Sequence, residues 1–333
     1  MLTITTVVSK FAPSAAAWSS FSSPTSRDLY ALYTVSPTEA WAVGQSGTII
    51  KWDGTRWSVV PSPTSENLHG VQILSSTEGW AVGRGGAIIR WNGTSWENFP
   101  SPTTEALREL SMLSSSHGWA VGFNGVILRW NGTVWENMPS PATENLLGVK
   151  AVSTSDAWAV GGSGRILRWN GENWLIVTSP TAERLTSVSM LSDNEGWATG
   201  VKVFLRWNGN SWSIFSASVG SYEFLSINMV SPDEGWAVGE YRTSHRGIVY
   251  KWDGSSWKYD GAPNMWLGAV QKLPSGEGWI VGEDGFVLQA NILGSPISAF
   301  YAVFVADILV LACLAVVFWR VWKAPKAVIE IRK

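Results

Sequence analysis

Short apolar runs alternate along the chain with clusters of Gly, Ser, Pro and Asn, and the pattern recurs at a fixed spacing. In one copy the apolar runs cover residues 107–113, 119–121, 126–130 and 135–138. Each run has the length of a strand and is bounded by residues that favour turns. The helical periodicity expected of a solenoid repeat is absent. We therefore expect four short strands in each copy.

Tryptophan marks the repeat most clearly. Seven tryptophans are separated by five steps of 39 residues and a final step of 43: Trp41, Trp80, Trp119, Trp158, Trp197, Trp236 and Trp279. Most are followed by a second and a third tryptophan in the pattern W-[D/N]-G-x-x-W. About 40 residues and four strands per copy match one blade of a β-propeller. The sequence predicts an all-β, seven-bladed β-propeller over residues 15–290.

The two ends of the repeat predict how the ring closes. The seventh copy reaches Ala290, where the second tryptophan would stand, and lacks the outer strand. At the other end of the chain, residues 18–25 align with residues 57–64 at a shift of 39. An N-terminal strand that completes the last blade leaves no incomplete sheet at the seam.

The repeated tryptophans have a structural interpretation. In W-A-V-G, Trp and Val project to one face of a strand while Ala and Gly leave the other face flat, so large side chains meet small ones between sheets. A ligand cage would not need a copy in every blade, and we expect core packing. The basic residues before the second tryptophans are expected to lay their stems over neighbouring indoles: Lys51, Arg90, Arg129, Arg168, Arg206 and Lys251.

The motif GWAVG-x-x-G-x-I-L-[K/R]-W-[D/N]-G-x-x-W resembles the propeller repeats of the photosystem II stability and assembly factor family. It also resembles the wider bacterial neuraminidase, or Asp-box, repeats. The resemblance implies a non-enzymatic chaperone that docks on membrane-protein intermediates. It further implies that the acid or amide before the hairpin glycine is a turn residue: Asp53, Asn92, Asn131, Asn170, Asn208 and Asp253.

A second segment follows the repeats. Residues 297–319 are 23 residues of which Asp307 alone is charged, a length that spans a bilayer as a helix. The predicted organisation is an N-terminal extension (1–14), the propeller (15–290), a linker (291–296), a transmembrane helix (297–319) and a basic tail (320–333). The chain is thus expected to cross the cell membrane once.

The tail sets the expected orientation. Its basic residues outnumber Glu330, and positive flanks stay in the cytoplasm, which makes the propeller extracytoplasmic. The start of the chain lacks the features of a signal peptide, and a simple tail anchor would instead leave the propeller in the cytosol. Asp307 has two interpretations: it pairs with a group on another membrane helix, or it is tolerated there in its protonated form.

Departures from the repeat are the candidates for partner binding. The sixth copy replaces a short turn with a polar loop at residues 240–246, expected at the same end of the ring as the linkers between blades. Those linkers carry equivalent glutamates, which form a partial acidic ring or are simply solvated. The candidate residues are Tyr241, Arg242, His245, Arg246, Trp266, Glu66, Glu105, Glu144, Glu183 and Asp307.

Composition removes several function classes. The chain has 24 Lys+Arg against 26 Asp+Glu, which argues against nucleic-acid binding. One Cys and three isolated His leave no metal site, and no nucleophile motif or phosphate-binding loop occurs, so neither an enzyme nor a cofactor is expected. A sialidase-like site would need clustered arginines with a tyrosine nucleophile, and no spacing supports one.

The sequence therefore predicts a non-catalytic, membrane-anchored propeller that acts as an interaction scaffold, assembly factor or accessory subunit of a membrane protein complex. A membrane protein partner would be contacted through Asp307 and the loop of the sixth copy. The alternative is a cell-surface, lectin-like propeller whose tryptophan-rich crevices stack on the sugar rings of a glycan.

Overall fold

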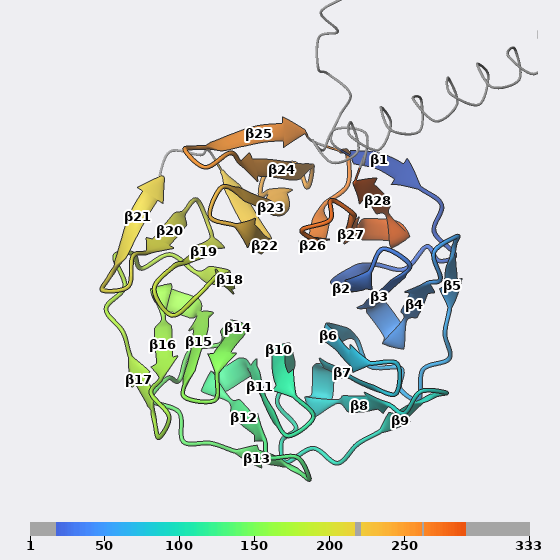
Figure 1. Cartoon of the computed structure of the whole chain (residues 1–333), viewed down its shortest axis with the longest axis horizontal. Coiled ribbons are helices and arrows are strands. Elements are labelled where there is room, and N and C mark those ends of the chain that lie inside the picture. The colour runs from blue at the N-terminus through green and yellow to red at the C-terminus, as the bar shows by residue number, and fades with distance from the viewer. Residues whose placement is uncertain (1–17, 217–220, 262, 291–333) are drawn as a thin grey trace, which may run out of the picture. The chain divides into compact units, whose positions relative to one another are not determined.

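The structure is a computed structural model that describes residues 18–216, 221–261 and 263–290. These residues form a closed ring of seven four-stranded antiparallel sheets around a central channel (Figure 1). The predicted all-β, seven-bladed propeller is confirmed. In the copy singled out from the sequence, the four strands are β10 (Leu107–Ser114), β11 (His117–Gly122), β12 (Ile127–Trp130) and β13 (Trp135–Asn137).

Each blade runs from an inner strand at the channel to an outer strand at the rim (Figure 1). The strands of blades one and two are β2 (Leu29–Ser36), β3 (Glu39–Gly44), β4 (Ile49–Trp52) and β5 (Trp57–Val59), then β6 (Leu68–Ser75), β7 (Glu78–Gly83), β8 (Ile88–Trp91) and β9 (Trp96–Asn98). Blade three is given above. Blade four has β14 (Leu146–Ser153), β15 (Asp156–Gly161), β16 (Ile166–Trp169) and β17 (Trp174–Ile176).

The remaining blades depart more from the common pattern. Blade five has β18 (Leu185–Met190), β19 (Gly196–Gly200), β20 (Phe204–Trp207) and β21 (Trp212–Ser216), and blade six has the longer β22 (Tyr222–Ser231), β23 (Glu234–Tyr241), β24 (Gly247–Trp252) and β25 (Trp257–Gly261). Blade seven has β26 (Leu267–Lys272), β27 (Gly278–Gly282), β28 (Val287–Ala290) and β1 (Trp18–Phe21). Short 3₁₀ turns join the second and third strands of five blades: η1 (Gln45–Gly47), η2 (Arg84–Gly86), η3 (Phe123–Gly125), η4 (Gly162–Gly164) and η5 (Glu283–Gly285).

Tryptophan packing between adjacent sheets holds the ring together. Trp158 and Val160 of blade four lie in one apolar cluster with Ala198 and Trp207 of blade five. The ring centroids of Trp158 and Trp207 are 4.7 Å apart, and Trp212 meets Trp158 edge-on at 5.5 Å. The same arrangement recurs at the other junctions, where large side chains fill the space beside alanines. The predicted packing role of the repeated tryptophans is confirmed.

The basic residue before each second tryptophan covers the first tryptophan of its own blade. Distances from the cationic group to the ring centroid run from 4.7 Å for Lys51 on Trp41 to 5.9 Å for Arg129 on Trp119. Such contacts combine packing of the aliphatic stem with attraction between the cation and the ring face. The expected role of these residues is confirmed.

The hairpin tips use their acid or amide as a turn residue, as expected. Asp53 Oδ1 accepts hydrogen bonds from the backbone N–H groups of Thr55 and Arg56, at 2.8 and 2.9 Å. Gly54, between Asp53 and Thr55, has a φ of 92°, which glycine adopts without a clash. Hydrogen bonds led by the Thr55 side chain lower the pKa of Asp53 to about 2.

The first described strand closes the ring. β1 pairs antiparallel with β28, with Trp18 opposite Ala290 and Phe21 opposite Val287. Phe21 also contacts Trp52 of blade one and Trp279 of blade seven, with ring centroids 5.1 and 5.3 Å away. The predicted three-plus-one closure is therefore confirmed.

Several predictions from the sequence lie outside the described residues. These are the N-terminal extension (1–14), the linker (291–296), the transmembrane helix (297–319) with Asp307, and the basic tail (320–333). Within the part of the chain that the structure does describe, no helix combines the length and apolarity that crossing a bilayer requires.

Candidate functional site

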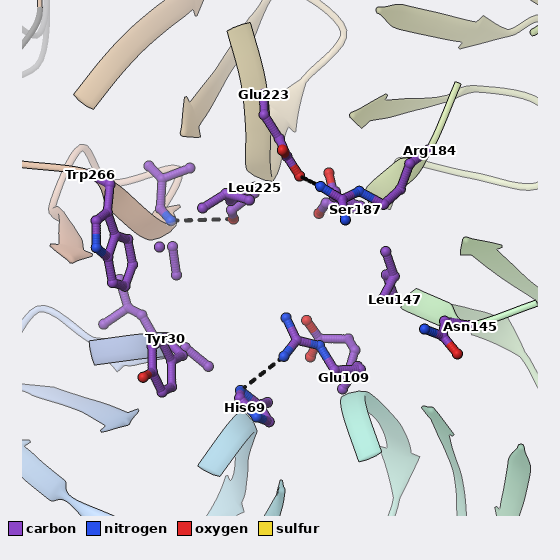
Figure 2. Close-up of a pocket in the computed structure, with 18 of the residues that line it drawn as sticks. Tyr30, His69, Glu109, Asn145, Leu147, Arg184, Ser187, Glu223, Leu225 and Trp266 are labelled. Carbon is purple, nitrogen blue, oxygen red and sulfur yellow. Dashed lines mark hydrogen bonds and ion pairs between the residues drawn. The ribbon is translucent and has the colours of Figure 1, made fainter. Parts of the chain in front are cut away.

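One end of the channel opens into a cavity of about 400 Å³. All seven inner strands contribute to its lining. The linkers between blades and the turns η3 and η4 reach the same end through Asn145, Phe123 and Gly162. Figure 2 shows the side chains converging on this space from opposite sides of the ring. A group bound here would contact several blades at once.

One repeat position supplies most of the chemistry of the cavity. Each inner strand carries a fully buried Leu or Phe near its start, and the next residue lines the cavity. A β-bulge follows in every inner strand, as between Leu107 and Glu109, and bulges re-aim side chains. The copies differ in size, charge and polarity at this position: Tyr30, His69, Arg108, Leu147, Thr186, Leu225 and Gly268.

Three aromatic rings form one wall of the cavity, here called the aromatic wall: Trp266, Tyr30 and His69 (Figure 2). Trp266 stacks on Tyr30 with a centroid distance of 5.9 Å and an angle of 10° between the planes. Tyr30 lies 5.1 Å from the His69 ring. Burial raises the pKa of Tyr30. The wall therefore offers a flat, largely apolar surface at neutral pH.

Arg108 lies beside the aromatic wall. Its Nη1 is 3.3 Å from His69 Nδ1, and because a guanidinium only donates, His69 accepts at Nδ1 and carries its proton on Nε2. Burial, followed by the charge of Arg108, lowers the pKa of His69 to about 3. His69 is therefore neutral at pH 7, and the positive charge here belongs to Arg108.

Glu109 lines the cavity next to Arg108. The ring surrounds this carboxyl, although part of the side chain is open to the channel. Burial raises the pKa of Glu109 to about 7, against the opposing effect of the Leu110 backbone N–H, which donates to its Oε1 at 3.1 Å. Glu109 is thus part neutral and part ionised near pH 7.

Glu223 connects the cavity to the loop of blade six. This carboxylate is 7% exposed, pairs with Arg184 of blade five and lies 3.9 Å from Nε of Arg242. Figure 2 shows the side chains of Arg184 and Glu223 meeting on one side of the cavity. One buried carboxylate thus holds two arginines from different elements, and it brings the predicted Arg242 to the edge of the cavity.

The other predicted residues of the blade-six loop lie apart from the cavity lining. Tyr241 shares a 2.8 Å hydrogen bond with the Tyr222 hydroxyl, which raises the Tyr241 pKa. The exposed His245 places Nδ1 2.9 Å from Glu240. Tyr241 and Arg246 instead line a separate hollow with Ser244 and Tyr259. The structure therefore divides these residues between two sites.

The linker glutamates lie at the expected end of the ring, but two of the four have local partners. Glu144 forms an ion pair with Arg165, the residue after η4, and this contact lowers the Glu144 pKa to about 2. Glu105 accepts a hydrogen bond from Asn124 Nδ2 at 3.0 Å. Glu66 lies beside the turn η2, and Glu183 is exposed. None of the four lines the central cavity.

The crevices between blades are not open to sugar rings. The first tryptophans of the repeats are at most 3% exposed, and the second and third ones pack against them. Neighbouring indoles cover the faces of these tryptophans, so the predicted stacking of sugar rings on them is not supported. Trp266 is the tryptophan that lines the cavity.

The cavity contains residues that the sequence singled out and others that it missed. Trp266 lines it and Arg242 reaches its edge, whereas Tyr30, His69, Arg108 and Glu109 were not predicted. The signal for them was present: the position after the buried Leu varies among otherwise similar copies. Asp307 lies outside the described residues and stays a prediction.

Solved structures that are similar to this chain support the fold. YCF48 bound to a D1 peptide is 19% identical, with 84% of this chain and 96% of that chain covered and a TM-score of 0.67. YCF48 from Cyanidioschyzon merolae is 17% identical over 84% and 100% of the chains, with a TM-score of 0.68. The WD40 propeller domain of Doa1 is 13% identical over 81% and 94%, with a TM-score of 0.70.

No protein-family model matches the sequence, and no curated protein is similar enough to count as a match. At these identities the structural likeness establishes the seven-bladed propeller fold and leaves the biological role to be argued from the site.

Proposed function

We propose that this chain is a non-catalytic interaction propeller, an assembly factor or accessory subunit, that binds a segment of a partner protein in the central cavity. One observation carries the proposal: the copies of the repeat differ in size, charge and polarity at the position where each inner strand faces the cavity. Positions common to the blades already serve packing, so the variable lining is free to specify a ligand.

The size and chemistry of the cavity suit a peptide segment. About 400 Å³ lies in the range of pockets that hold a few side chains. The aromatic wall provides apolar contact area, while Arg108 and Asn145 provide polar contacts. One solved propeller of similar fold is described as bound to a peptide, which supports the same class of ligand here.

The proposal of a non-catalytic role rests on the contacts of the tyrosine and arginines that a sialidase-like reaction would need, because these side chains already have partners within the protein. Tyr241, the nucleophile that a sialidase-like reaction would use, bonds to Tyr222 outside the cavity lining. Arg184 and Arg242 are held by Glu223. Within the described residues, no group of three or more His, Cys, Asp or Glu side chains is placed to hold a metal ion.

Site-specific photo-crosslinking in the native cell tests the binding site. A photoreactive amino acid at Leu147 of blade four or at Leu225 of blade six is expected to capture the same protein segment, identified by mass spectrometry. Trp266→Ala should reduce both adducts at least about fivefold, because it removes most of the aromatic wall. Val59, 59% exposed on an outer strand, is the control position. An adduct from Val59 but none from Leu147 or Leu225 would place binding on the rim instead.

We further propose that residues 297–319 anchor the propeller to the cell membrane, with the propeller outside and the tail in the cytoplasm. The support is the length and apolarity of this segment and the excess of basic residues after it. Asp307 within it would pair with a group on a membrane helix of the partner.

Fractionation and protease shaving test the anchor. The full chain should sediment with membranes and resist extraction by carbonate, whereas a chain ending at residue 296 should be released. Protease added to intact cells should digest the propeller while an internal cytoplasmic marker survives. A propeller digested only after lysis would contradict the outward orientation. Release of the full chain by carbonate would contradict the anchor itself.

A further inference from the structure

Arg108 differs from Arg165, Arg184 and Arg242 in having no carboxylate partner. Arg184 and Arg242 contact Glu223, and Arg165 contacts Glu144. Among the residues that the structure describes, no carboxylate oxygen lies within the 4.0 Å ion-pair distance of Arg108; its hydrogen-bond partner is His69. Arg108 is partly buried, and a partly desolvated charge without a counter-ion is costly.

Apart from Glu109, the surroundings of Arg108 do not supply that counter-ion. His69 is neutral, and the Phe123 ring, 6.0 Å from Cζ, offers only the weak negative potential of its face. Burial lowers the pKa of Arg108, but a guanidinium keeps its proton at neutral pH. The cavity therefore presents a fixed positive charge beside the aromatic wall.

Glu109 is the carboxyl group with the largest electrostatic effect on Arg108. The groups that face it electrostatically are Arg108 on its own strand and Lys150 on β14. Lys150 is open to the channel, and its pKa is lowered by burial within the ring and raised by Glu109. His69 on β6 is neutral, while Arg184, which directly precedes β18, forms an ion pair with Glu223 on β22. When ionised, Glu109 offsets the charge of Arg108, and when protonated it does not.

We propose that the cavity binds a carboxylate of the partner segment on the Arg108 guanidinium, with a neighbouring aromatic side chain against Trp266 and Tyr30, and that ionised Glu109 weakens this binding. This inference rests on the proposed peptide-binding function and specifies its ligand. A planar guanidinium binds a carboxylate with two parallel hydrogen bonds, which a neutral amide does not reproduce.

The sign of the pH dependence follows from the two carboxyls. The ligand carboxylate is ionised throughout the range from pH 6 to 8. Its negative charge favours the neutral form of Glu109, so binding takes up a proton at Glu109. Affinity is therefore greatest below the Glu109 pKa of about 7 and falls as the pH rises through that value. His69, with a pKa of about 3, does not titrate in this range.

Matched peptide probes test the proposal. Ligand-observed NMR titrations with the purified full chain in mild detergent would compare N-acetyl-phenylalanine with its amide, and acetyl-Phe-Asp-amide with acetyl-Phe-Asn-amide. The first pair reports a terminal carboxylate, and the second pair reports a side-chain carboxylate. We expect at least one acidic probe to bind about tenfold more tightly than its neutral match at pH 6. Its affinity should fall roughly threefold to tenfold by pH 8.

Three variants assign the effect to named residues. Arg108→Gln should abolish the preference for the acidic probe, and Glu109→Gln should keep the preference but remove its pH dependence. Arg56→Gln, which alters a hairpin-tip arginine with an 81% exposed side chain, should change neither. Thermal melts of each variant establish that it is folded.

The outcomes separate this inference from the proposed function. Equal binding of acidic and neutral probes, lost in Trp266→Ala, would overturn the carboxylate site and leave peptide binding standing. An acidic preference that survives Arg108→Gln would also overturn it, as would the absence of binding by all four probes. Tighter binding of a methyl sialoside than of any peptide probe would overturn the peptide assignment and favour an acidic sugar.

Discussion

Removal of residues 1–22 is expected to lower the melting temperature by at least about 10 °C. The deletion takes away β1, leaving β28 as an unpaired edge, and it removes the contacts of Trp18 with Trp236 and of Phe21 with Trp52. Loss of a packed aromatic side chain costs about 3–5 kcal/mol, and each kcal/mol shifts the melting temperature of a domain of this size by roughly 2–4 °C. Differential scanning calorimetry measures the shift.

A shorter deletion is the matched control. Removal of residues 1–14 leaves Trp18–Phe21 in place and should change the melting temperature by less than about 2 °C, since no described contact is lost. The longer deletion should also make the protein prone to associate, because an exposed strand edge pairs with other chains. Equal melting temperatures for the 1–22 deletion and the full chain would show that β1 does not close the ring in solution.

Replacement of Trp197 by alanine is expected to cost about 3–5 kcal/mol of unfolding free energy. Trp197 is fully buried, and its ring centroid lies 4.8 Å from Trp252 and 5.0 Å from Phe215. Alanine would leave a cavity between blades five and six that the rigid sheets cannot collapse to fill. Arg206, whose guanidinium lies 5.4 Å from the Trp197 ring, would lose its support as well.

Trp266→Ala provides the comparison for Trp197→Ala. Trp266 lines the cavity instead of an interface between blades, so we expect a loss of less than about 1.5 kcal/mol by urea denaturation. The two variants remove the same side chain from the same fold, and the difference between them measures the interblade packing. A cost for Trp197→Ala no greater than that for Trp266→Ala would contradict the packing role of the repeated tryptophans.

The fold was predictable because the same pattern of strand and turn residues occurs in seven copies. The alternation in W-A-V-G, the Gly after each hairpin acid or amide, and the match of residues 18–25 to residues 57–64 each specify a feature that the structure contains. Every copy repeats the evidence, so variation at single positions in one copy does not obscure the strand pattern. The ring closure needed one further observation, namely that the last copy ends at Ala290.

The site was predictable only where it departs from the repeat. Trp266 and Arg242 lie in segments that break the pattern, which is why they stood out. Arg108 and Glu109 occupy an ordinary strand position, and a β-bulge determines that both line the cavity. The sequence does not show that bulge, nor that Glu223 holds two arginines from different blades. These features depend on contacts between residues far apart in the chain.

The pairing of β1 with β28 has a consequence for biogenesis. β1 precedes the other described strands in the chain, so it finds its partner only when the seventh blade has been made, and such distant contacts form late because a long loop must close first. Until then Trp18 and Phe21 lack their native neighbours, and their exposed hydrophobic surface is available to chaperones and to other nascent chains. The ring can therefore close only after the final repeat has been translated. A ribosome that stalls before that point would hold an open intermediate that is prone to aggregate.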